Sequence, residues 1–181
     1  ADLSRLGESY IERTRRQRPL GRPFFIDKMP NNWMHVPLIL RLLPKPRIID
    51  ARREPMACGF SNFKQHFARG QNFSYGLSDI GRYYRDYLRL MANVEHAAPG
   101  RVLLVEHEKM VDDTEGQIRR LLDFVGVDYS DSCRNFFENK RSVRTASSEQ
   151  VRRPIFRDGL EQWRHYEPWL GPLREALRGV S

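Results

Sequence analysis

Cysteine is scarce in this chain, and so are long apolar runs. Only two of the 181 residues are cysteines, Cys58 and Cys133, which are too few for a disulfide framework and lack the spacing of a metal site. We therefore expect a reducing, cytoplasmic setting. No apolar run approaches the roughly 18–20 residues that a membrane span needs, and the amino-terminal stretch lacks the apolar core of a signal peptide. We expect no membrane partner.

Several motifs of common enzyme classes are also missing. The chain has no G-x-x-x-x-G-K-[ST], G-x-G-x-x-G, H-E-x-x-H, G-x-S-x-G or C-x-x-C. Its five histidines have no metal-ligand spacing, and its carboxylates are scattered without an evident pair. These absences argue against a metal site and against hydrolase chemistry.

The composition is that of a folded, basic protein. An apolar fraction of 40% with 11% aromatic residues supports a core in a single domain over residues 1–181. The net charge of +8 suits an anionic partner, such as nucleic acid, acidic lipid, an acidic substrate or a nucleotide. The basic residues are divided between turns and one loop, and no recognition helix stands out, so we expect no nucleic-acid partner.

Hydrophobic periodicity predicts strands that alternate with helices. Apolar runs predict strands at 24–26, 48–51 and 102–105, and apolar residues at helical spacing predict helices at 2–18, 32–43, 55–67, 77–97, 114–126 and 160–177. A polar stretch, 139–158, indicates an ordered or ligand-gated loop, because long polar loops in compact domains are usually functional or disordered. This order predicts an α/β fold with a parallel sheet flanked by helices.

Polar side chains follow each predicted strand. Lys28 follows the first, Arg52 and Arg53 the second, and His107 the third. Carboxyl ends of parallel strands are where ligands bind in α/β sheets, and the start of the next helix has unpaired N–H groups that suit a phosphate. Lys28 could instead be a surface lysine paired with Asp27, and a lone histidine is more often structural.

Four stretches carry a resemblance to a known family. They are DKMPNN (27–32), RREPMACGFSNF (52–63), VLLVEHEKMVDD (102–113) and TASSEQVRRPIF (145–156). Their order resembles the carboxyl-terminal part of a sulfotransferase, and the closest type looks like the tyrosylprotein sulfotransferases and their bacterial relatives fused to tetratricopeptide repeats.

The resemblance implies a donor and a set of site residues. The donor would be 3′-phosphoadenosine 5′-phosphosulfate and the product adenosine 3′,5′-bisphosphate. Lys28 resembles the catalytic lysine that stabilises the leaving phosphate. Arg53 and Ser61, eight residues apart, resemble the pair that binds the 3′-phosphate. His107 stands where a tyrosine usually contacts the nucleotide, and Ser147 and Arg153 resemble the hydroxyl and basic positions of a late nucleotide-binding loop.

The chain also departs from this family. The family's P-loop-like strand–loop–helix, which grips the 5′-phosphosulfate, has no counterpart before Lys28, and Pro30 stands where the small-molecule enzymes have a histidine base. We therefore expect a P-loop-NTPase-like sulfotransferase fold that lacks its amino-terminal element, with a partner that could cover the missing sheet edge. The expected function is sulfuryl transfer to an acceptor hydroxyl of unknown class. The alternative is a non-catalytic module that binds a nucleotide or polyanion.

Overall fold

The computed structural model of the chain describes residues 2–18, 20–67, 70–140 and 149–180. The chain divides into two compact units. The first unit consists of Ala1–Ile48 and Tyr87–Val102, and the second of Ile49–Asp86 and Leu103–Ser181. Lys28 belongs to the first unit, whereas Arg53, Ser61, His107 and Arg153 belong to the second. The expectation of one domain over residues 1–181 stays a prediction.

The first unit is helical. It contains α1 (Leu3–Thr14), a 3₁₀ helix at Arg15–Gln17, a second at Pro30–His35, and α2 (Val36–Leu42). The long helix α4 (Leu77–Ala97) supplies its carboxyl-terminal part from Tyr87 onward. The core of the unit forms around three buried side chains, which are Val36, Met91 and Val94. Partly buried side chains pack against them, among them Trp33, Tyr87 and Leu90.

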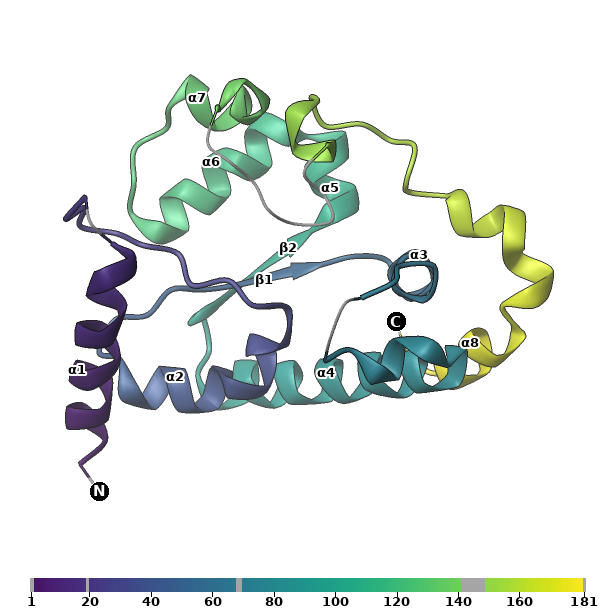
Figure 1. The fold of residues 1–181 in the computed structure, drawn as a ribbon, viewed down its shortest axis with the longest axis horizontal. Helices are drawn as coiled ribbons and strands as arrows, with labels where there is room; N and C mark the ends of the chain where they lie inside the picture. Colours follow the sequence, from purple (N-terminus) through teal and green to yellow (C-terminus); the bar gives the residue numbers. More distant parts are fainter. Residues whose placement is uncertain (1, 19, 68–69, 141–148, 181) are drawn as a thin grey trace. The chain divides into compact units, whose positions relative to one another are not determined.

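The carboxyl-terminal end of α2 lies against α1, where the two backbones approach closely (Figure 1). A Cβ atom at Gly7 would lie 2.1 Å from the carbonyl oxygen of Leu42, far inside van der Waals contact. Only glycine permits this approach, because it has no Cβ. Asp2 caps α1, since its Oδ1 accepts a hydrogen bond of 3.0 Å from the N–H of Ser4.

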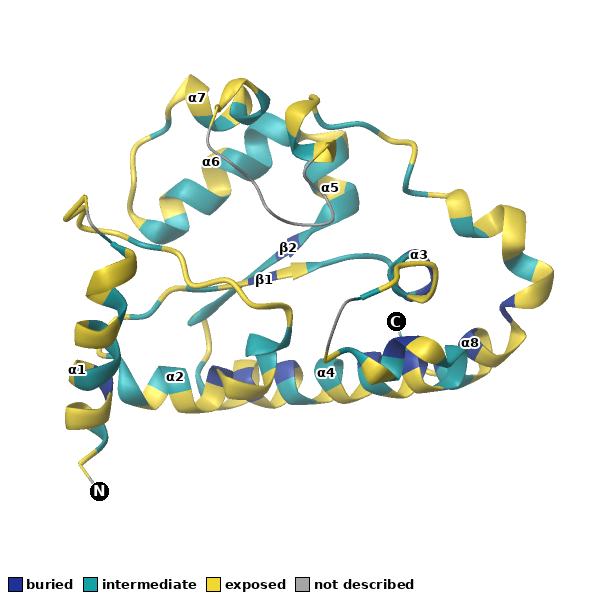
Figure 2. Cartoon of the chain, viewed as in Figure 1, coloured by how far each residue is buried: buried dark blue, intermediate teal, exposed yellow. Residues whose placement is uncertain are grey.

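The predicted strand at 24–26 is wrong. Residues 24–29 form neither a strand nor a helix. Phe24 is 64% exposed and Ile26 is 92% exposed, and only Phe25 between them is partly buried. A strand needs a neighbour to satisfy its backbone groups, and the described part of the chain pairs only two strands, neither of which takes up this segment. Figure 2 shows the exposure of much of this stretch.

The two remaining predicted strands pair as a small parallel sheet (Figure 1). They are β1 (Ile48–Arg52) and β2 (Val102–Glu106). β1 leads into α3 (Pro55–Phe63), and β2 leads directly into α5 (His107–Asp112). The chain is therefore mostly helical with a small parallel sheet, which fits the expected α/β class. The P-loop-like detail stays a prediction.

The rest of the second unit consists of helices. It includes α6 (Thr114–Val125), α7 (Asp131–Arg134), 3₁₀ helices at Asn72–Tyr75, Phe136–Glu138, Gln150–Arg152 and Gln162–Trp169, and α8 (Gly171–Ala176). The ring of Phe60 in α3 stacks on Tyr166 with centroids 4.8 Å apart, and α8 packs on α3 where Gly59 faces Leu173. These contacts bring the end of the chain back onto α3.

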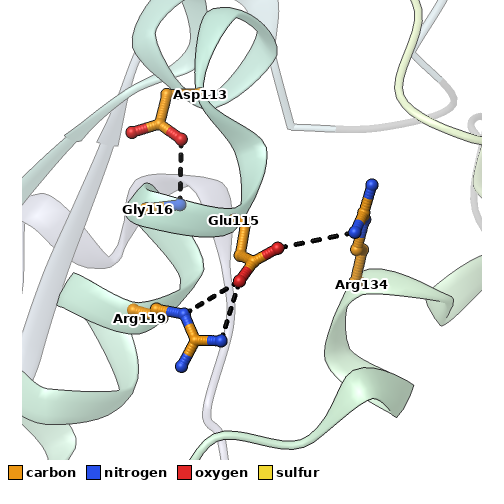
Figure 3. A network of polar contacts seen from close by, with 5 residues as sticks. All are labelled: Asp113, Glu115, Gly116, Arg119 and Arg134. Carbon is orange, nitrogen blue, oxygen red and sulfur yellow. Dashed lines mark hydrogen bonds and ion pairs between the residues drawn. The ribbon is translucent and has the colours of Figure 1, made fainter.

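Polar contacts at the start of α6 join α6 to α7 (Figure 3). Asp113 caps α6, because its Oδ1 accepts a hydrogen bond of 3.0 Å from the N–H of Gly116. Glu115 accepts hydrogen bonds of 3.0 and 2.7 Å from Arg119 one turn later, and its other oxygen lies 3.4 Å from Arg134 of α7. All these groups are exposed, so the network adds little to stability beyond the helix cap.

No helix in the described residues has both the length and the apolar character that crossing a membrane requires.

Candidate functional site

Arg53 lies one residue beyond the carboxyl end of β1 and is half-buried. Its Nη2 donates a hydrogen bond to the carbonyl oxygen of Gly159, and its own carbonyl accepts a hydrogen bond of 2.7 Å from Tyr84. Its Nε is buried and has no hydrogen-bond partner among the described residues. A buried N–H donor without a partner is costly, and the described residues leave this donor unsatisfied, as they do the Nε of Arg18.

His107 lies close to Arg53. It is the first residue of α5, directly after β2, and the carboxyl ends of parallel paired strands meet at one edge of the sheet. Burial lowers the pKa of His107, and the charge of Arg53 lowers it further, whereas Glu108 raises it. The structure therefore brings these two residues together at the carboxyl edge of the sheet, where the lowered pKa of His107 favours its neutral form.

Ser61 and Cys58 lie on the same side of α3. Residues at i and i+3 of a helix are neighbours on one side, and Cys58 is close enough to Arg53 for that charge to oppose the rise that burial causes in its thiol pKa. Ser61 is half-buried and stands six residues into α3, which is about 9 Å along the axis. In the described residues no hydrogen bond joins Arg53 to Ser61.

Arg52 differs from its neighbour. Its Nη2 lies 2.7 Å from Oδ2 of Asp50 two residues earlier on β1, and Asp50 is only 8% exposed. A buried carboxylate needs a partner of this kind. The charge of Arg52 is therefore engaged within the strand, whereas Arg53 lies beyond the strand's end.

The start of α3 is closed by a carboxylate, and the expectation of unpaired N–H groups there is wrong. The side chain of Glu54 accepts hydrogen bonds of 3.0 and 2.6 Å from the N–H groups of Met56 and Ala57. The N–H of Glu54 in turn donates to Glu108 at 3.0 Å. Since glutamate is not among the preferred capping residues, the sequence carries no strong signal for this cap, and an anion at this edge would have to rely on side chains.

Lys28 lies in the first unit, in the irregular segment 24–29, and is exposed. It is not paired with Asp27, which was one of the two interpretations that the sequence left open. Asp27 instead accepts a hydrogen bond of 2.6 Å from the hydroxyl of Tyr10. Among the described residues Lys28 has no hydrogen-bond or ion-pair partner, so its ammonium is available to a ligand.

The predicted late loop is described only in part. Ser147 lies outside the described residues. Arg153 follows a short 3₁₀ helix, is exposed, and places its guanidinium 4.7 Å from the ring centroid of Phe156.

A cleft of about 800 Å³ lies in the second unit, but none of the predicted site residues that the structure describes lines it. Five carboxylates line it: Glu54, Glu108, Asp112, Asp158 and Glu161. Arg157 and Arg164 also line it and pair with Asp112 and Glu161, so the lining carries only a partial excess of negative charge, which disfavours a nucleotide's phosphates. Within the described ranges no group of three or more histidine, cysteine, aspartate or glutamate side chains could hold a metal ion.

Two residues that hold Arg53 in place, Tyr84 and Gly159, were not predicted from the sequence. Tyr84 belongs to an aromatic stripe of α4 that reads as core packing, and its hydroxyl nevertheless bonds to the carbonyl of Arg53. Burial raises the pKa of this hydroxyl and keeps it a donor. Gly159 stands 106 residues after Arg53, so no local pattern could have indicated the contact.

Most of the chain is similar to known proteins. Residues 3–131 match the model of the sulfotransferase family, a range that includes Lys28, Arg53, Ser61 and His107. A protein of Aquifex aeolicus (strain VF5), described only as uncharacterized, is 33% identical over 159 residues, which cover 86% of this chain and 21% of that protein. The chain thus spans about a fifth of the length of this curated relative.

Proposed function

Because the chain belongs to the sulfotransferase family, we propose that it takes part in transferring a sulfuryl group from 3′-phosphoadenosine 5′-phosphosulfate to an acceptor hydroxyl. The observation that carries this proposal is Arg53, which stands at the carboxyl edge of the sheet with a buried, unpartnered Nε among the described residues. In the proposal this guanidinium binds the 3′-phosphate of the donor.

The chemistry of Arg53 suits a phosphate. A guanidinium offers a planar fork of N–H donors that bind phosphate oxygens in pairs, and each charge-assisted bond is worth about 1.5–3 kcal/mol. The hydroxyl of Ser61 on α3 would add a further bond. His107 would contact the nucleotide from the end of β2, and Ser147 with Arg153 would do so from the late loop.

Lys28 would act on the transferring group. In an in-line displacement the acceptor oxygen attacks sulfur and its hydroxyl proton passes to water, while the bond from sulfur to the bridging oxygen breaks and its electron pair leaves with adenosine 3′,5′-bisphosphate. An ammonium at the bridging oxygen stabilises that developing charge. Lys28 is exposed and unpaired among the described residues, as this role requires. The donors for the 5′-phosphosulfate are not identified in this chain.

Nucleotide binding is the first test. Adenosine 3′,5′-bisphosphate at millimolar concentration should raise the melting temperature of the chain, since a ligand that binds only the folded state stabilises it. Arg53→Ala should abolish most of the shift. Arg85→Ala, which removes an equal charge from an exposed position on α4, is the matched control. An equal shift in both variants, or none in the folded wild-type chain, would refute the proposed binding residue.

Sulfuryl transfer is the second test. The labelled donor is offered with a tyrosine peptide, a carbohydrate or a small alcohol, and Lys28→Ala should reduce transfer at least about a hundredfold, as removal of one donor to developing charge commonly does. Binding of the nucleotide without transfer to any acceptor would support the alternative, a non-catalytic nucleotide-binding module. Full transfer by Lys28→Ala would refute the role of this lysine.

A further inference from the structure

The segment that carries Lys28 has no regular structure of its own. Residues 24–29 form no strand, and the side chains of Phe24 and Ile26 are largely exposed. The segment is therefore stabilised neither by hydrogen bonds to a neighbouring strand nor by burial of Phe24 and Ile26. Something else must determine where Lys28 lies.

Two side chains from the amino-terminal helices contact this segment. The hydroxyl of Tyr10 on α1 donates a hydrogen bond of 2.6 Å to Asp27, the neighbour of Lys28. The guanidinium of Arg18, just after the 3₁₀ helix that follows α1, lies 4.3 Å from the ring centroid of Phe25. The two contacts lie on either side of Ile26, so they restrain both the position and the direction of the segment.

The groups that make these contacts are themselves well anchored. Nη2 of Arg18 donates a hydrogen bond of 2.7 Å to the carbonyl of Ile11 on α1. α1 is in turn held against α2 by the approach of Gly7 to Leu42. Beyond Lys28, Trp33 packs edge-on against Tyr87, with centroids 5.8 Å apart. Both ends of the segment are thus tied to the first unit.

The hydroxyl of Tyr10 remains a donor throughout the neutral range. Burial, together with the hydrogen bond to Asp27 and its charge, raises the pKa of Tyr10 to about 12, although Arg18 opposes the shift. A hydrogen bond to a charged acceptor is stronger than one between neutral groups.

We propose that Tyr10 and Arg18 are positioning residues, which hold segment 24–29 against α1 so that the ammonium of Lys28 is presented in one place. This inference rests on the proposed function, because the position of Lys28 matters only if that lysine acts on the sulfuryl donor. Neither residue contacts the donor in this scheme. Their effect reaches the chemistry only through the segment.

The first test measures how often the segment opens. An endoproteinase that cuts after lysine will cleave the bond between Lys28 and Met29 at a rate set by the open fraction when opening is fast. Tyr10→Phe removes only the hydroxyl, and it should speed this cleavage about tenfold, the equivalent of one lost hydrogen bond to a charged group. Cleavage after Lys109, in the second unit, should keep its wild-type rate.

Matched variants separate a local effect from a general loss of stability. Tyr75→Phe removes a hydroxyl from an exposed tyrosine of the second unit and should leave cleavage at Lys28 unchanged. Asp27→Asn keeps a side-chain oxygen that accepts from Tyr10 and should stay within about threefold of wild type, because a bond between neutral groups is weaker. Asp27→Ala should match Tyr10→Phe, and the double variant Tyr10→Phe/Asp27→Ala should be no faster than either single variant.

Two results would overturn the proposal at this stage. One is cleavage of Tyr10→Phe at the wild-type rate. The other is an equal acceleration at Lys28 and Lys109, which would mean that the hydroxyl only stabilises the fold as a whole.

Kinetics then distinguish this inference from the proposed function. Tyr10→Phe should lower kcat for sulfuryl transfer with little change in KM for the donor, because a displaced Lys28 fails mainly in the transition state. If Lys28→Ala loses transfer but Tyr10→Phe, with its loosened segment, transfers normally, the positioning role is refuted and the role of Lys28 stands. If Lys28→Ala transfers normally, both fail.

Discussion

Gly59→Ala tests how the end of the chain is docked on the helix that carries Ser61. Gly59 lies on α3 and faces Leu173 of α8, whose side chain is 0% exposed. A Cβ atom at Gly59 would lie 2.7 and 2.8 Å from the two methyl carbons of Leu173. Carbon atoms are normally separated by about 3.5–4.0 Å, so the helices must separate or Leu173 must change its rotamer.

Two opposing contributions determine the size of the effect. Forcing a methyl group into a packed core costs about 1–3 kcal/mol. Alanine stabilises a helix interior relative to glycine by about 0.8–1.0 kcal/mol. Because Leu173 is fully buried and has little room to move, we expect the clash to prevail, with a net loss of up to about 2 kcal/mol in the free energy of unfolding.

A double-mutant cycle isolates this contact. Leu173→Ala alone should cost about 2–5 kcal/mol. The methyl group that Gly59→Ala introduces should then occupy part of the vacated space, so the combined variant should lose about 1–3 kcal/mol less than the sum of the single losses. Urea denaturation followed by tryptophan fluorescence measures each value, with an unchanged m-value as the sign that the states remain comparable.

Gly171→Ala is the matched control. A Cβ atom at Gly171 would meet no atom within 4 Å outside its chain neighbours, and only the ring of the following Pro172 disfavours a side chain at this helical position, so this variant should cost less than about 1 kcal/mol. If Gly59→Ala proves as stable as Gly171→Ala and its effect adds to that of Leu173→Ala, α8 does not pack on α3 in this way.

Three further predictions concern the carboxyl edge of the sheet. Glu54→Ala should lower the free energy of unfolding by about 0.5–2 kcal/mol, because the N–H groups of Met56 and Ala57 lose their cap; an unchanged urea midpoint would contradict the cap. Burial and the charge of Arg53 lower the pKa of His107 in the folded chain. As the pH drops below about 6.5, the imidazole therefore takes up a proton more readily in the unfolded chain, and the free energy of unfolding should fall. His107→Gln should remove this component of the pH dependence. In an NMR titration, adenosine 3′,5′-bisphosphate should raise the pKa of His107 by offsetting the charge of Arg53, and no change on saturation would contradict a phosphate at that guanidinium.

Local periodicity was enough to predict the main elements of the fold. The repeat of apolar residues in 77–97 predicted α4 with its observed bounds Leu77–Ala97, and the apolar runs at 48–51 and 102–105 predicted β1 and β2. These elements depend on side chains near one another in sequence. The helix predicted over 55–67 ends earlier, at Phe63, because the termination of a helix depends on how the following chain packs.

Pairing and capping depended on residues that the local pattern does not identify. The apolar run at 24–26 has the composition of a buried strand, but a strand forms only where a neighbour takes up its backbone groups. The start of α3 was predicted to be open to an anion, and the side chain of Glu54 closes it instead.

The sequence by itself determined the family, the order of the elements and the residues Lys28, Arg53, Ser61 and His107 as candidates, because residue type and spacing are properties of the chain alone. The tertiary structure decided how these residues are held. Gly159 and Tyr84, 106 and 31 residues from Arg53, fix that guanidinium and leave its Nε without a partner in the described residues. Tyr10, 17 residues from Asp27, restrains the segment that carries Lys28. Such contacts join residues far apart in the chain, and they exist only once helices and strands have packed.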